Sequence, residues 1–159
     1  MYRFGSGIST CDVSSMYKPL FDAAIESKDW ALADEILAHI SSHMMQPSID
    51  ILSKYLCALT RNFRIVKAID LIESIYSRKL GIVLSERELM DVSCCILEEC
   101  SRMGLADDAL WLIERMRGMQ MRPNLRCWEL LAEALCVTSR FEEAFDTINV
   151  RIESMISFN

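Results

Sequence analysis

The stretch GLADDALWLIERMRGMQMRPN, residues 104–124, decides how the whole chain is interpreted, because its pattern occurs again elsewhere. Ala109 has apolar residues three positions before it and three and four positions after it. Residues at this spacing lie on one face of an α-helix. The methionine-rich end of the stretch leads to Pro123, which cannot continue a helix. The stretch therefore predicts an amphipathic helix and a turn that follows it.

Three other segments align with this helix on a single alanine: ALADEILAHI, IVKAIDLIESI and FEEAFDTINVRI. The shared alanines, Ala33, Ala68, Ala109 and Ala144, are separated by 35, 41 and 35 residues. Before each of these helices lies another helical run: YKPLFDAAIE, LSKYLCALTR, SCCILEECSR and WELLAEALCV. A period near 35 residues, with two helices in each period, predicts a repeat array.

Each unit is expected to be a pair of antiparallel helices that cannot cover its own apolar faces. Stacked neighbours bury a continuous core, so the pattern predicts an all-α solenoid, a superhelix of four helix pairs. The second unit is the longest, and its extra residues around Gly81 are expected in a loop. We place the units at 14–48, 49–89, 90–124 and 125–159, after a flexible N-terminal lead-in of residues 1–13.

The composition excludes several classes of function. With 17 basic and 23 acidic residues the formal net charge is −6, which gives no general attraction to nucleic acid or to anionic membranes. No apolar run is long enough to cross a bilayer, so no membrane insertion is expected. The seven cysteines show no even framework, which predicts reduced, buried thiols. No Gly-rich phosphate loop, nucleophile elbow or acid–base carboxylate pair is visible, so we expect neither an enzyme nor a cofactor.

Two groups of residues suggest a metal site at first sight. His39 and His43 are four residues apart on one predicted helix, a spacing that lets two imidazoles share a metal, but no convincing third ligand accompanies them. Cys94, Cys95 and Cys100 lack the paired knuckles of structural zinc sites. Free cysteines pack as small hydrophobic residues, and Cys95 and Cys100 are expected in the core. We therefore predict no metal site.

The repeats resemble a known family. Units of 35 residues, a G-x-x-x-x-A-L phrase entering the second helix and a closing P-N or P-S are similar to pentatricopeptide repeats. The resemblance spans residues 14–159 and is clearest in the third unit, while tetratricopeptide repeats, with a period of 34, are the near rival. Members of the pentatricopeptide family are typically organellar, mostly mitochondrial or plastid, and many bind single-stranded RNA at one base per repeat.

In the RNA-binding members, the fifth residue of the first helix and the last residue of the unit read each base. Glutamate and cysteine are poor substitutes for the small hydroxyl and amide side chains that do this reading, so only Asn124 fits well. The corresponding residues are Lys18 with Ser48, Cys94 with Asn124, Glu129 with Asn159, and Ser53 without an identified partner.

Positions two, five and nine of each first helix are expected to line the concave groove of such an array. This set holds two basic and six acidic residues, a balance that works against RNA and suits a basic protein segment. The methionines and arginines of RMRGMQM offer a local phosphate patch, although packing against the next unit is the plainer explanation. The predicted groove residues are Ser15, Lys18, Asp22, Asp50, Ser53, Cys57, Asp91, Cys94, Glu98, Arg126, Glu129 and Glu133, with Asn124 beside them.

The final helical segment, RFEEAFDTINVRIESMISFN, carries an apolar stripe that starts at Phe141. Terminal repeats normally need a polar outer face. We therefore predict that this stripe is a docking surface for a partner subunit or for a second copy. Its residues are Phe145, Ile148, Ile152 and Met155.

These observations predict a non-catalytic helical-repeat scaffold that binds other protein subunits of an organellar ribonucleoprotein assembly, such as a mitochondrial ribosome. The organelle is implied by the resemblance alone. The alternative is an organellar module that binds single-stranded RNA in RNA processing or translation. A third class, an RNA-processing enzyme that uses these repeats for targeting, would need a catalytic domain beyond Asn159.

Overall fold

The protein is all-helical. The computed structural model describes the backbone of residues 10–157 and the side chains from Ser15 onward, and this part of the chain contains eight helices and no strand. The all-α prediction is therefore confirmed. The helices are α1 (Thr10–Glu26), α2 (Trp30–Ser42), α3 (Ile49–Arg61), α4 (Ile65–Tyr76), α5 (Glu86–Met103), α6 (Ala106–Gly118), α7 (Leu125–Val137) and α8 (Phe141–Ile156).

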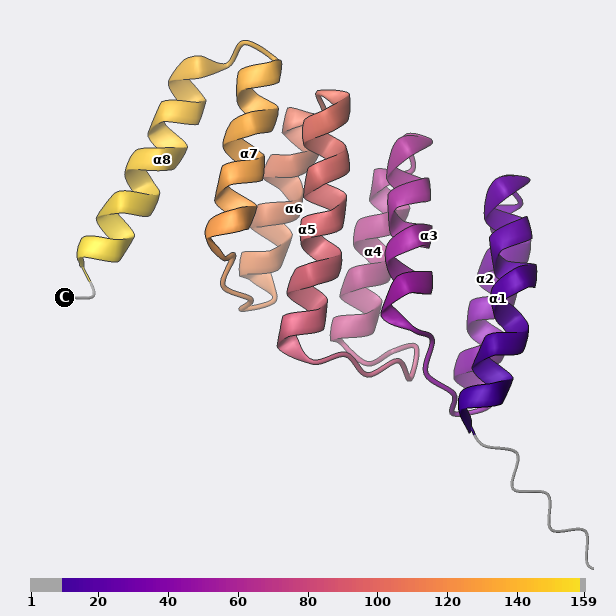
Figure 1. The fold of residues 1–159 in the computed structure, drawn as a ribbon. Coiled ribbons are helices and arrows are strands. Elements are labelled where there is room, and N and C mark those ends of the chain that lie inside the picture. Colours follow the sequence, from indigo (N-terminus) through magenta and orange to yellow (C-terminus); the bar gives the residue numbers. More distant parts are fainter. Residues whose placement is uncertain (1–9, 158–159) are drawn as a thin grey trace, which may run out of the picture.

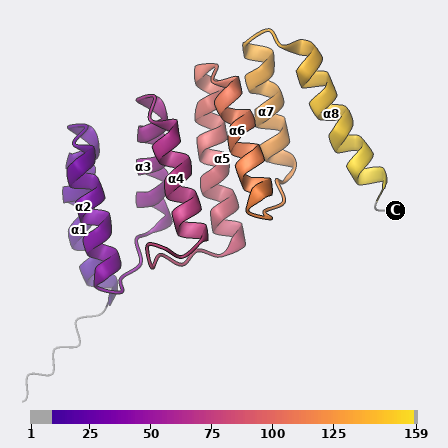
Figure 2. The ribbon, with the colours of Figure 1, turned by 180° about the vertical axis from the view of Figure 1, so that it is seen from behind.

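The eight helices form four successive pairs that follow one another in a row (Figure 1). The first helices of the pairs, α1, α3, α5 and α7, contact one another in that order. We call these four helices the first-helix row. The second helices α2, α4 and α6 lie behind it, where α4 contacts α6, as the reverse view shows (Figure 2), and α8 lies beyond α7 at the end of the row.

The shared alanines lie in the core. Ala33, Ala68, Ala109 and Ala144 each stand at the fourth position of a second helix and are at most 2% exposed. The distance between two packed helices depends on the side chains at their contact, so a small residue here allows close approach. The larger core side chains, among them Tyr55, lie between successive pairs as well as within them.

The first seven helices all end in the same C-capping motif. A residue with positive φ follows each helix, and the next backbone N–H donates to a carbonyl five positions earlier, as Leu105 does to Cys100 at 2.9 Å. Pro123 was expected to stop α6, but the helix ends before it, at Gly118. The left-handed residues are Lys28, Met44, Phe63, Arg78, Gly104, Gln120 and Ser139.

The structure differs from two predicted boundaries. Helix α1 begins at Thr10, so residues 10–13 belong to a helix and not to a lead-in, and residues 1–9 lie outside the described part. The predicted boundary between the second and third units falls inside α5. That helix starts four residues earlier, behind a capping box of Ser85 and Glu88, which satisfies N–H groups that would otherwise be unpaired. The extra residues therefore lengthen a helix as well as a loop.

The left-handed turn residues give a test of this fold. Gly104 has φ of +68°, and an added Cβ would meet only ordinary contacts, so Gly104→Ala should lower the free energy of unfolding by about 1 kcal/mol through backbone strain. Gly118 is the matched control, because it is helical and its Cβ position is open. Gly118→Ala should raise stability by up to about 1 kcal/mol. Urea unfolding measures both, and equal effects would contradict the assignment.

Candidate functional site

The residues predicted to line a groove all lie on the first-helix row or its caps. Most are exposed, and Asp22, Ser53, Cys57 and Cys94 are half-buried. Their helices are consecutive neighbours, so the structure brings some of them into contact across helices. It joins Glu98 with Arg126, and Cys94 with Asn124, while the partner of Asp22 is Lys54, which was not predicted.

A cluster of carboxylates lies at the α5 and α7 end of this row. The guanidinium of Arg126 is 3.8 Å from Glu98, 3.6 Å from Glu129 and 3.8 Å from Glu133. All four side chains are about half exposed. One arginine therefore faces three carboxylates at distances longer than a direct hydrogen bond, which leaves this surface negative.

Asn124 has a structural role that the sequence reading missed. Its side-chain oxygen accepts a hydrogen bond from the backbone N–H of Cys127 at 3.0 Å and so caps α7. Ser48, at the end of the first predicted unit, caps α3 in the same way through Ile51. These two of the proposed base-reading residues are thus engaged by the next helix, and their position just before an apolar helical run is the signal for an N-cap. Asn159, the third closing residue, lies outside the described residues.

Thiols occupy the middle of the first-helix row. The sulfur atoms of Cys94 and Cys127 are 3.4 Å apart, and the Cys57 thiol lies 3.9 Å from the Cys95 carbonyl oxygen. Cys100 is buried as expected, and this burial raises its pKa to about 12. Cys95 is half-buried, which corrects its predicted place in the core, and a hydrogen bond from Cys57 lowers its pKa to about 7. All six cysteines among the described side chains are free thiols, but only Cys100 and Cys127 are buried, and Cys136 is exposed, so the prediction of buried thiols is wrong for the other four.

Ion pairs between successive helix pairs share a direction. In five cases the earlier pair supplies the carboxylate and the later pair supplies the base. The exception is Arg61 of α3, which donates to Glu99 of α5. The first-helix row contains Asp22 with Lys54 and Glu98 with Arg126, and the second helices and their caps contain Asp34 with Lys67, Glu73 with Arg115 and Asp107 with Arg140.

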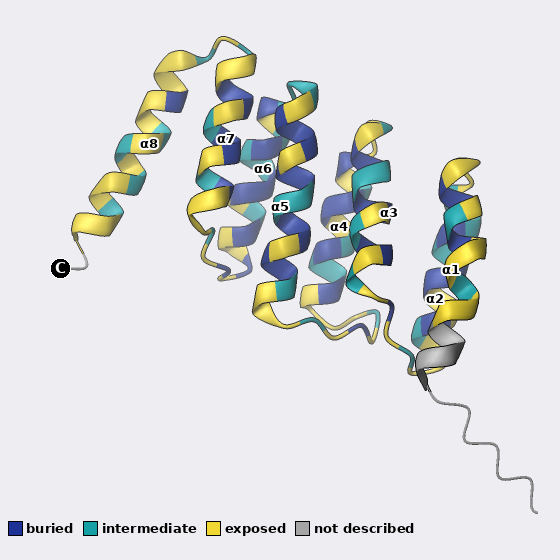
Figure 3. Ribbon diagram, viewed as in Figure 1, coloured by how far each residue is buried: buried dark blue, intermediate teal, exposed yellow. Residues whose placement is uncertain are grey.

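An apolar groove opens between α7 and α8. It has a volume of about 470 Å³, and the apolar residues of its α8 wall are Ile148, Ile152 and Met155, which are 48%, 48% and 55% exposed. Helix α8 is largely exposed, and Ala144 is its one buried residue among those described (Figure 3). Three of the four predicted stripe residues therefore share a groove.

The α7 wall of this groove was not predicted. It contains Leu125, Trp128 and Ala132, whose spacing of three and four residues forms a second apolar stripe on α7. That stripe is the signal from which the wall could have been found. Phe145, by contrast, does not line the groove, because it lies with Phe141 in a separate shallow hollow.

A basic residue also lines the groove. Arg151 belongs to α8, and its Nε atom is buried without a hydrogen-bond partner among the described residues. The carboxylates of Glu129 and Glu133 lie on the opposite, α7 side. Unpaired buried donors are rare in folded proteins, so this atom marks a position where a partner group would be favourable.

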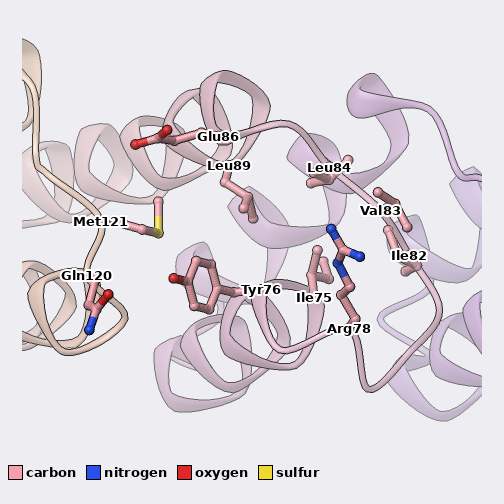
Figure 4. A pocket seen from close by; sticks show the side chains of 10 residues that line it. All are labelled: Ile75, Tyr76, Arg78, Ile82, Val83, Leu84, Glu86, Leu89, Gln120 and Met121. Carbon is pink, nitrogen blue, oxygen red and sulfur yellow. The ribbon is translucent and has the colours of Figure 1, made fainter.

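A second hollow, of about 310 Å³, lies beside the long loop between α4 and α5 (Figure 4). Its lining comes from the ends of these helices, from the loop and from the turn after α6, and the side chains of Tyr76, Leu89 and Met121 point into it. Arg78 and Glu86 are the charged residues of the lining. The lining does not pair a nucleophile with a base, so it offers no evident chemistry.

The two histidines contact each other on α2 and its C-cap. Their ring centroids are 4.2 Å apart. Nδ1 of His39 is hydrogen-bonded to the Tyr17 hydroxyl, and Nδ1 of His43 is hydrogen-bonded to the backbone carbonyl oxygen of His39. Among the described residues, no three His, Cys, Asp or Glu side chains are grouped to hold a metal. Within residues 10–157, no helix is both long and apolar enough to span a bilayer.

Comparison with known proteins adds no assignment. No model of a known protein family matches the chain, and no curated protein sequence matches it. The resemblance to pentatricopeptide repeats therefore stays a prediction that rests on the period and motifs of the sequence.

The Glu99 carboxylate predicts a pH dependence of stability. It is 6% exposed, and hydrogen bonds from Arg61 at 2.9 and 2.5 Å hold its pKa below the ordinary value of 4.5. A depressed pKa in the folded state adds stability above the unfolded-state pKa, and this stability is lost as the pH falls through the folded-state pKa. Glu99→Gln should therefore cost about 1 kcal/mol at pH 7 and progressively less below pH 4.5.

The matched control is Glu98→Gln, because Glu98 is half exposed and lies 3.8 Å from Arg126. Its cost should stay below about 0.5 kcal/mol. Urea unfolding at several pH values measures both variants. A Glu99→Gln effect that does not change with pH would show that ionisation of this carboxyl does not support the fold.

Proposed function

We propose that this chain is a non-catalytic helical-repeat scaffold, a pentatricopeptide-type α-solenoid that binds other protein subunits of an organellar ribonucleoprotein assembly. The proposed location is mitochondrial, and a mitochondrial ribosome is the kind of assembly intended. Family and location rest on the resemblance in the sequence. Protein binding rests on the surface of α7 and α8.

The observation that carries the proposal is the exposed apolar surface of the last helix pair. Ile148, Ile152 and Met155 are about half exposed along one groove, and Phe145 is 64% exposed beside it. Covering side chains of this size contributes on the order of 1 kcal/mol each when half of their surface is removed from water. Exposed apolar surface of this extent, bordered by charged residues, is typical of a protein interface.

The charges of the first-helix row favour protein over RNA. Glu98, Glu129 and Glu133 outnumber the one arginine between them, and such a surface repels phosphates. The side-chain oxygen of Asn124, the best candidate for base reading, caps α7. RNA binding is therefore the second candidate, supported by the resemblance to the family and not by these contacts.

The first prediction from this proposal concerns RNA. A mobility-shift titration of the whole chain with single-stranded RNAs of different sequence should show weak binding without sequence preference, because the row is acidic. Raising the salt concentration should abolish what binding remains. Sub-micromolar, sequence-selective binding at physiological salt would make the RNA-binding module the better assignment.

The second prediction concerns assembly. A chain with Phe145→Ser and Ile152→Lys should remain helical, since both residues are about half exposed or more, and should no longer co-sediment with large assemblies in a gradient of cell extract. Val150→Lys is the matched control on the same helix, because Val150 is 55% exposed and does not line the groove. Normal co-sedimentation of the double variant would exclude this surface as the interface.

A further inference from the structure

Each described helix pair before the last has its first helix covered by the first helix of the next pair: α3 contacts α1, α5 contacts α3, and α7 contacts α5. The contact between α3 and the first pair shows in detail how such a helix fits. Tyr55 of α3 packs edge-on against Phe21 at 5.3 Å between ring centroids and lies near Trp30 at 6.3 Å. Its hydroxyl donates to Asp34 of α2 at 2.5 Å.

The α7/α8 groove is an open apolar surface on the last described pair. It lies between a first and a second helix, and its walls are apolar, with Trp128 on α7 and Ile148 and Ile152 on α8. No described helix occupies it. A helix placed there would continue the contacts that α3, α5 and α7 each make.

The charge of the occupant follows from the direction of the ion pairs. Asp22, Glu98 and Glu133 occupy the same position of their first helices, the ninth in the predicted alignment. Asp22 accepts from Lys54 of the next first helix at 2.8 Å, and Glu98 lies 3.8 Å from Arg126 of its next first helix. Glu133 has the same place on α7, where it shares Arg126 with two other carboxylates. Glu133 also accepts a hydrogen bond from the Ser101 hydroxyl at 3.4 Å, but among the described residues no base of a following helix pairs with it.

We propose that the α7/α8 groove binds an amphipathic α-helix of a partner protein, and that the basic edge of this helix faces Glu129 and Glu133. This inference rests on the proposed protein-binding function. The apolar face of that helix enters between Trp128 and Ile152, as Tyr55 of α3 enters between α1 and α2. The opposite edge of the helix carries an acceptor for the guanidinium of Arg151, which lines the same groove. Complementary charge on both edges sets the orientation of the helix in the groove.

The test uses the whole chain and a capped synthetic peptide of residues 48–62, kept reduced. This segment contains α3 with Lys54 and Tyr55, the chain's own example of a helix in such a position. Fluorescence anisotropy of labelled peptide measures affinity, and the indole N–H signal of Trp128, assigned with Trp128→Phe, reports the site. We expect saturable binding of one peptide per chain that shifts the Trp128 signal and leaves that of Trp111 in place.

Variants of the chain locate the binding and test its charge. Ile152→Asp, or Met155→Asp if the first variant loses helicity, should weaken binding by about tenfold or more, whereas Val150→Asp should not. Glu133→Lys should weaken binding about three- to tenfold, and a peptide with Lys54→Glu should recover that loss on the Glu133→Lys chain. Recovery by the exchanged charges requires the two side chains to be neighbours.

Absence of binding, binding that Ile152→Asp and Met155→Asp leave unchanged, or absence of charge-exchange recovery would each overturn the inference. Self-association of the chain that Ile152→Asp abolishes would overturn it too, because the occupant would then be a second copy. These outcomes are separable from the proposed function. Sequence-selective RNA binding would contradict the proposed function but would not affect binding in the groove. If the peptide does not bind but assembly still depends on Ile152, the proposed function stands and a basic helix is excluded as the occupant.

Discussion

The structure depends on one constraint: a pair of short helices cannot cover its own apolar faces, so each pair is stable only against its neighbours. Tyr55 shows this directly, because it belongs to α3 but its ring lies against Phe21 and Trp30 of the preceding pair. The same helix must then present its other side to α4 and α5. Folding of any pair is therefore coupled to that of the pairs beside it.

Ion pairs between successive helix pairs accompany this apolar stacking, and most of them have the same orientation. Lysines and arginines of later pairs meet carboxylates of earlier pairs, in both rows of helices, and the pair of Arg61 with Glu99 is the exception. Most of these contacts are partly exposed and add little stability individually. Their shared direction matters more for recognition, since it disfavours pairs that stack in the wrong order or orientation.

The candidate interface follows from the same two features. The walls of the α7/α8 groove are built like the internal contacts, with apolar side chains between a first and a second helix and carboxylates along one edge. Walls of this kind suit a further helix, and this likeness is the basis of the proposed interface. The exposed side chains of α8 add little to the described core, so they are available to stabilise a complex instead.

The amino-acid pattern alone predicted the helices and the period near 35 residues, because apolar positions at the 3.6-residue repeat indicate which face of each helix is buried. It could not determine what covers each face. The capping role of Asn124, the extra turn at the start of α5 and the α7 wall at Trp128 emerged only in the tertiary structure. The ion pairs between successive helix pairs join residues that are distant in the sequence, such as Asp22 with Lys54, and their partners depend on how the helices stack, which a local pattern does not record.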